Sequence, residues 1–123
     1  MHEYQIDIEK ATLENTNYRK VLFTGKKLQL VVMSLKPQED IPKEKHEDTD
    51  QFIRVESGNA LVSVEGKDHH VKDDDVVIVP AGSTHYVKNT GTTDLKIYTI
   101  YTPPEHAPGT IQKTREEALK AHH

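Results

Sequence analysis

Short segments with alternating apolar and polar residues fill most of the chain. In residues 51–58, Gln51, Ile53 and Val55 occupy every second position, so they share one face of a strand. Other segments with the composition or period of strands lie at 27–35, 59–66, 76–80, 85–89 and 95–102. Turn residues recur about every eight to twelve positions, which is the spacing of an antiparallel sandwich or barrel.

Two further local patterns predict a turn and a helix. Ser57-Gly58-Asn59 lies between two strand segments and predicts a hairpin. Thr114 and Glu117 form a capping-box pattern ahead of residues 115–122, which predicts a short C-terminal helix. Residues 9–15 predict a single helical turn. We therefore expect an all-β fold, whose closed sheet leaves room inside for side chains and one small ligand.

Length and composition limit the class of protein. The 123 residues predict one domain, 1–123, with a barrel core at about 20–102 and a loop and helix at 103–123. Only 34% of the residues are hydrophobic, so the core is economical or some apolar surface lies between subunits. The net charge of −4, with both signs interspersed, gives no basic stripe for nucleic acid.

The sequence also bears on location and redox chemistry. The apolar runs are too short to cross a bilayer, and the first residues lack the apolar segment of a secretory signal, so we expect a cytoplasmic protein and no membrane partner. The chain has no cysteine, which excludes disulfides and thiolate metal sites.

Four polar side chains can meet inside such a barrel. Glu44 and His46 share one face of an extended segment, Gln51 can return to that face after a polar bend, and His85 begins another strand. If these strands are neighbours, the four side chains converge, and burying them together is costly unless they bind something. The alternative is an exposed, charged turn at residues 43–50 with two solvated histidines.

These residue types suit a metal ion. Imidazole nitrogen and carboxylate oxygen are ligands for first-row divalent metals. Glu44, His46 and His85 form a set of two histidines and one carboxylate, which leaves coordination positions open, as in non-haem iron oxygenases. Gln51 would add a fourth, neutral oxygen ligand or a hydrogen bond beside the ligands.

Residues 38–58 resemble the first motif of the cupin superfamily. That motif is glycine, five residues, His-x-His, three or four residues, glutamate, six residues and glycine. His46 takes the place of the second histidine and Gly58 that of the closing glycine. Glu44 replaces the first histidine, Gln51 the glutamate and Gln38 the opening glycine.

Residues 74–89 resemble the second cupin motif, which is glycine, five residues, Pro-x-Gly, two residues, histidine, three residues and asparagine. Pro80, Gly82, His85 and Asn89 match in register, and Asp74 replaces the glycine. The chain resembles small single-domain cupins labelled mannose-6-phosphate isomerase-like, a label of fold kinship. The resemblance implies a jelly-roll β-barrel, a metal site and a homodimer.

The departures from the first motif keep the charge of the site. The usual cupin set of three histidines and one glutamate carries −1, and so does the present set of two histidines, Glu44 and Gln51. Replacing an imidazole by an amide oxygen makes the site harder and favours Mn or Fe over Cu, whereas Ni and Zn remain candidates because they bind such sites more tightly. We expect one divalent transition metal: Mn, Fe, Ni or Zn.

Two functions fit this expectation. The first is a small-molecule enzyme whose metal acts as a Lewis acid or activates dioxygen, with dioxygenase, isomerase, decarboxylase and lyase chemistry unresolved. Its substrate would be polyhydroxylated or carboxylated. The second is a non-catalytic cupin that binds a sugar-like ligand, with a structural metal or none.

The remaining histidines are ranked below this set. His106 lies in the proline-rich segment 103–110, which can cover the barrel mouth as a lid; a solvated loop histidine is the alternative. His69 and His70 are expected at a hairpin tip, in solvent. His122 and His123 resemble a purification-tag remnant that would bind metal adventitiously.

Overall fold

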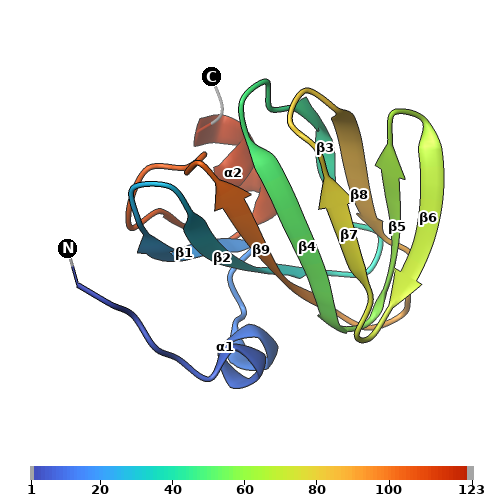
Figure 1. Ribbon diagram of the computed structural model, residues 1–123. Coiled ribbons are helices and arrows are strands. Elements are labelled where there is room, and N and C mark those ends of the chain that lie inside the picture. Colours follow the sequence, from blue (N-terminus) through green and yellow to red (C-terminus); the bar gives the residue numbers. More distant parts are fainter. Residues whose placement is uncertain (1, 122–123) are drawn as a thin grey trace.

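The computed structural model describes residues 2–121, which form two antiparallel sheets and two short helices (Figure 1). The strands are β1 (Arg19–Thr24), β2 (Gln29–Leu35), β3 (Asp40–Lys45), β4 (Asp50–Ser57), β5 (Asn59–Val64), β6 (Lys67–Lys72), β7 (Val76–Val79), β8 (Thr84–Asn89), β9 (Leu95–Thr102) and β10 (Ile111–Gln112). The helices are α1 (Ile8–Glu14) and α2 (Arg115–Ala121).

The chain passes repeatedly between the two sheets, as a jelly roll requires. The larger sheet has the order β10-β1-β2-β9-β4-β7, and the smaller has the order β3-β8-β5-β6. The chain changes sheet after β2, β3, β4, β6, β7 and β8. Figure 1 shows the two sheets facing each other around a common interior.

The change of sheet after β4 makes the predicted hairpin at residues 57–59 wrong. β4 and β5 belong to opposite sheets, and Gly58 joins them with a φ of +115°. A Cβ at this glycine would lie 3.1 Å from the Cα of Leu95, so the position requires a residue without a side chain. A corner between sheets and a hairpin share the same turn residues, which is why the sequence did not separate them.

β5 instead forms a hairpin with β6. Val64 pairs with Lys67, and Glu65 and Gly66 make the two-residue turn with φ values of 49° and 78°. His69 and His70 therefore lie within β6, opposite Val62 and Leu61, and the expectation that they occupy the hairpin tip is wrong. β6 is the outer strand of its sheet, and its charged composition suits that edge.

Apolar residues from both sheets fill much of the interior. The core residues that are at most 2% exposed and come from β2, β4, β5, β8 and β9 are Val31, Met33, Leu35, Ile53, Val55, Ala60, Val62, Val87, Leu95 and Ile97. Gln51, Ile53 and Val55 are all buried along β4, whereas Arg54 between them is only half-buried, so the predicted alternation is confirmed.

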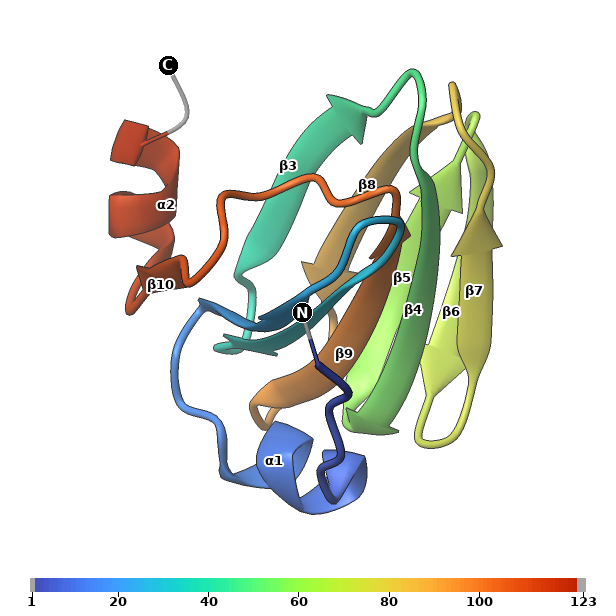
Figure 2. The ribbon, with the colours of Figure 1, turned by 60° about the vertical axis from the view of Figure 1, so that its left-hand side comes forward.

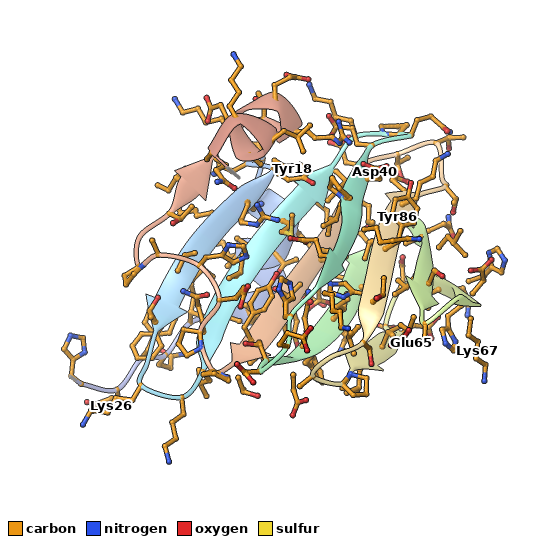
Figure 3. All side chains as sticks on the ribbon, turned by 90° about the horizontal axis from the view of Figure 1, so that it is seen from above. Tyr18, Lys26, Asp40, Glu65, Lys67 and Tyr86 are labelled. Atoms are coloured by element: carbon orange, nitrogen blue, oxygen red, sulfur yellow. The ribbon has the colours of Figure 1, made fainter. Side chains whose placement is uncertain are left out.

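Hydrogen bonds around Asp40 close one edge of the barrel (Figure 3). The Tyr18 hydroxyl donates to the Asp40 carbonyl at 2.7 Å, and the Tyr86 hydroxyl donates to the Asp40 carboxylate at 2.7 Å. Arg115 of α2 forms an ion pair with the same carboxylate at 2.7 Å. The cluster ties the start of β1, the strands β3 and β8, and the C-terminal helix together.

Both helices begin with a side-chain cap. Asp7 accepts a hydrogen bond from the Lys10 N–H at the start of α1. Thr114 accepts from the Glu117 N–H, and the Glu117 carboxylate accepts from the Lys113 N–H, so the predicted cap of α2 is confirmed. No helix in residues 2–121 is long and apolar enough to cross a membrane.

Candidate metal centre

Polar side chains occupy the inward positions at one end of the barrel. On the larger sheet, Tyr101 of β9 pairs in register with Gln29 of β2 on one side and with Gln51 of β4 on the other. On the smaller sheet, Glu44 of β3 pairs with His85 of β8. The alternation that buries Ile53 and Val55 also turns these residues inward.

Three of the four predicted ligands come together here. Glu44, His46 and His85 each offer one ligand atom, and these atoms all lie within 4.8 Å of one another. The ring centroids of His46 and His85 are 5.2 Å apart. The pairing of β3 with β8 brings about this convergence, because Glu44 and His85 are direct neighbours across the two strands. Residues 43–50 are therefore not simply an exposed charged turn.

Gln51 approaches this end of the interior from the opposite sheet. Its side chain is buried, with 3% of the residue exposed, and its Nε2 donates to the Tyr101 hydroxyl at 3.3 Å. The Tyr101 ring lies 6.1 Å from that of His46, so Tyr101 connects Gln51 to the histidines. Gln51 Oε1 is buried and has no hydrogen-bond partner within the described part of the chain. A buried amide oxygen without a partner is costly, and a bound cation would satisfy it.

Glu105 belongs to the site, although the sequence did not indicate it. Its carboxylate lies 2.8 Å from His46 Nδ1, and the His46 side chain is only 9% exposed. His85 Nδ1 makes a similar but longer contact, at 3.3 Å, with the Ser83 carbonyl. Each imidazole thus directs one nitrogen at a protein oxygen, which leaves Nε2 for an ion, a common arrangement of metal-binding histidines.

The segment 103–110 lies against this end of the barrel. The fully buried Gln29 fastens it: Gln29 Oε1 accepts from the N–H groups of Glu105 and His106, at 3.2 and 2.9 Å, and its Nε2 donates to the His106 carbonyl at 2.7 Å. Figure 2 shows the segment crossing from the end of β9 to β10. The prediction that this segment covers the mouth of the barrel fits this arrangement.

His106 is part of the cover and is not simply a solvated loop histidine. It is half-buried, and its ring lies 5.1 Å from the Tyr101 ring in an edge-to-face arrangement. Tyr101 is thus enclosed between His106, His46 and Gln51. His122 and His123, the suspected tag remnant, lie outside the described residues.

Burial sets the protonation of two groups in the site. It lowers the pKa of His85 below its usual value, which favours the neutral imidazole that a metal requires. It raises the pKa of Tyr101 above its usual value, so the hydroxyl remains protonated and can donate a hydrogen bond. Two acidic residues, Glu44 and Glu105, lie beside these groups and give the site a negative charge suited to a cation.

A cavity of about 620 Å³ adjoins the site. The residues that line it come from β1, β3, β10, α2 and the segment 103–110, and include Tyr18, Arg19, Lys43, Glu44, Glu105 and His106. Glu44 thus belongs both to the ligand cluster and to the wall of the cavity. A volume of this size is typical of sites for small molecules.

Comparison with known proteins agrees with this structure. Residues 31–101 match the family model described as the cupin domain. The crystal structure of BH2720 from Bacillus halodurans is 39% identical and superposes with a TM-score of 0.94, covering 97% of this chain and 95% of that one.

Two curated relatives extend the comparison. An uncharacterized Bacillus subtilis protein, YrkC, is 44% identical over 96% of this chain and 67% of its own length. An oxalate-binding protein of Thermotoga maritima is 31% identical over 55% of this chain and 56% of its own length. With the jelly-roll topology and the match over residues 31–101, these similarities show that the chain belongs to the cupin family.

Proposed function

We propose that Glu44, His46, His85 and Gln51 bind one divalent transition metal and that this centre acts on a small molecule. The observation that carries the proposal is the cluster of three ligand atoms within 4.8 Å of one another. The unpartnered Oε1 of Gln51 fits a fourth ligand. The proposed ligands are carboxylate oxygen, amide oxygen and imidazole nitrogen, with no sulfur. Such a set favours Mn or Fe, although Ni and Zn bind it more tightly and compete.

The surrounding residues support this role for the cluster. Glu105 holds the ring of His46 in place, and such carboxylate–histidine contacts commonly raise metal affinity. Gln29 and the segment 103–110 fix Glu105 in turn. The protonated Tyr101 hydroxyl is a buried donor next to Gln51.

When bound, the metal would supply Lewis-acid polarisation of a ligand oxygen or a site for dioxygen. Dioxygenase, isomerase, decarboxylase and lyase reactions are all compatible with such a centre, because the fold does not select among them. The cavity beside Glu44 gives a small molecule access to the centre.

A second candidate function is binding without catalysis. The relative from Thermotoga maritima is named for binding oxalate, which favours a cupin that holds a small ligand rather than converts it. In that case a metal would be structural or would serve only to hold the ligand. The homodimer and the cytoplasmic location expected from the sequence stay predictions.

An open coordination position distinguishes a working centre from a closed structural one. We would load the protein with one equivalent of Mn²⁺ and record its electron paramagnetic resonance spectrum in ordinary and in ¹⁷O-enriched water. Line broadening by ¹⁷O is expected, because four protein ligands leave positions of a six-coordinate ion to water. Without broadening, the metal would be shielded and the catalytic proposal would fail.

Turnover is then tested with the iron form. Oxygen uptake is followed for the Fe²⁺-loaded protein and for its His85→Ala variant, with candidate hydroxylated and carboxylated compounds. Uptake by the first protein alone supports oxygenase chemistry. If compounds bind but are recovered unchanged whichever metal is loaded, the binding function is favoured.

A further inference from the structure

We propose that Arg19 is the anion-binding residue of the 620 Å³ cavity, and that the natural ligand is a small carboxylate. Arg19 would hold the carboxylate, and a hydroxyl or carbonyl oxygen of the same ligand would face the candidate metal centre. This second contact rests on the function proposed above, whereas the role of Arg19 rests on its own surroundings.

Arg19 is a buried cation on the wall of the cavity. Only 7% of the residue is exposed. Its Nη1 donates to Gln112 Oε1 at 2.7 Å, and its Cζ lies 5.5 Å from the centroid of the Tyr18 ring. Its Nε is buried and has no hydrogen-bond partner in residues 2–121. The guanidinium is therefore held in place by neutral groups, and it still has a donor free for a further hydrogen bond.

Arg19 differs from the other two arginines of the chain, which form ion pairs with carboxylates. Arg54 forms ion pairs with Glu56 and Asp74, and Arg115 forms one with Asp40, whereas no ion pair of Arg19 occurs in the described chain. A buried charge with no opposite charge in direct contact is costly. A ligand anion in the cavity would remove that cost.

The chemistry of Arg19 and of the cavity favours a carboxylate. The planar guanidinium matches the two oxygens of a carboxylate and binds them with charge-assisted hydrogen bonds. Glu44 and Glu105 also line the cavity, and their charges disfavour a more highly charged group such as phosphate. Because Arg19 and Glu44 line one cavity, a ligand of modest size can contact both.

The test compares gluconate with sorbitol, which have the same number of carbons and differ in the terminal carboxylate. Calorimetry would measure the binding of each to wild type, Arg19→Gln and Arg54→Gln, each loaded with one equivalent of Mn²⁺ and free of excess metal. Arg54 lies on the outer face of β4, so Arg54→Gln is the matched loss of one arginine outside the cavity. Mn²⁺ content is measured for every variant.

We expect wild type and Arg54→Gln to bind gluconate at least about tenfold more tightly than sorbitol. Arg19→Gln should lose this preference, with gluconate binding weakened about tenfold to a hundredfold and Mn²⁺ content unchanged. Equal gluconate affinity in wild type and Arg19→Gln would overturn the proposal, and so would a wild type that does not prefer gluconate.

A measurement on the wild type covers the case in which Arg19→Gln does not fold. In protein loaded with diamagnetic Zn²⁺, the assigned Nε–H resonance of Arg19 should shift when gluconate is added and stay in place with sorbitol; an unmoved resonance would overturn the proposal. The same titration without metal separates the two proposals. A chain that takes up no Mn²⁺ but still shifts the Arg19 signal with gluconate would sink the metal centre and leave the anion site standing.

Discussion

The two ends of the barrel interior are built by the same strands but have opposite character. Along β9, Leu95 and Ile97 are fully buried and apolar at one end, whereas Tyr101 at the other end contacts Gln51 and two histidines. Along β2, Leu35 lies at the apolar end and Gln29 at the polar end. The inward period is identical throughout, so residue type alone divides the interior into a packed core and a site.

The two ends also differ in how their groups are satisfied. The apolar end gains free energy from burial and close packing and needs no partner. The polar end carries groups that are costly to bury, and only some have partners in the described chain. Gln29 makes hydrogen bonds with the segment 103–110 and with Thr24, whereas Gln51 Oε1 and Arg19 Nε have no hydrogen-bond partner in residues 2–121. In the proposals above, a cation would bind at the Gln51 oxygen and an anion at the Arg19 N–H.

Removing His85 should affect the polar end most. We expect His85→Ala to abolish stable binding of one divalent ion per chain, because it removes a buried ligand from the cluster. His106→Ala is the control and should retain near-normal metal content, since His106 is not one of the three residues whose ligand atoms converge. Dialysis followed by elemental analysis measures both. Loss of metal from His106→Ala as well would mean that the ligand set is incomplete.

Removing a core side chain at the apolar end should lower stability and leave metal binding unchanged. Ile97→Ala should lower the free energy of unfolding of the metal-free protein by about 2–5 kcal/mol. Ile100→Ala, on the half-buried outer face of the same strand, is the matched control and should cost less. Urea unfolding measures both variants. Metal uptake by folded Ile97→Ala should stay normal, and its loss would show that the two ends are not independent.

A variant of Glu105 tests whether the segment 103–110 contributes to metal binding. Glu105→Ala should weaken metal binding about 10- to 100-fold by releasing His46 Nδ1, whereas the free energy of unfolding should change little at this exposed position. Glu117→Ala, another exposed acidic residue that lines the cavity, is the control. Competition with a chelator measures the affinities. If both variants weakened binding equally, overall negative charge and not the contact with His46 would be responsible.

Gln51→Glu should give the smallest change in metal affinity, and this change should be an increase. An added carboxylate charge should tighten divalent binding if Gln51 Oε1 is a ligand. Gln29→Glu places the same charge on β2, across β9 from Gln51, where the oxygen already accepts two backbone hydrogen bonds, and should not tighten metal binding. The same chelator competition is used. Weaker binding by Gln51→Glu would remove Gln51 from the ligand set.

The parts that the sequence predicted correctly depend on short-range regularities. The alternation in residues 51–58 identified the inward face of β4, and the spacing of Thr114 and Glu117 identified the start of α2. Strand period and motif spacing both pointed to Glu44, His46 and His85, whose ligand atoms the fold brings within 4.8 Å of one another; their role as metal ligands stays a prediction.

The parts that the sequence did not predict depend on contacts between distant segments. Glu105 meets His46 only because Gln29 fixes the segment 103–110 against the barrel. Arg19 gives no signal in the sequence, because its burial follows from the pairing of β1 with β10 beside α2 and not from its neighbours in sequence. β6 was missed because an edge strand rich in charged residues shows little apolar alternation.

The most direct measurement is elemental analysis of protein purified without added metal, with His122 and His123 removed, beside the same protein carrying His85→Ala. We expect about one ion of Mn, Fe, Ni or Zn per chain in the first protein and almost none in the second. Equal content in both, or no metal in either even after titration, would contradict the metal centre and leave a barrel that binds its ligand without one.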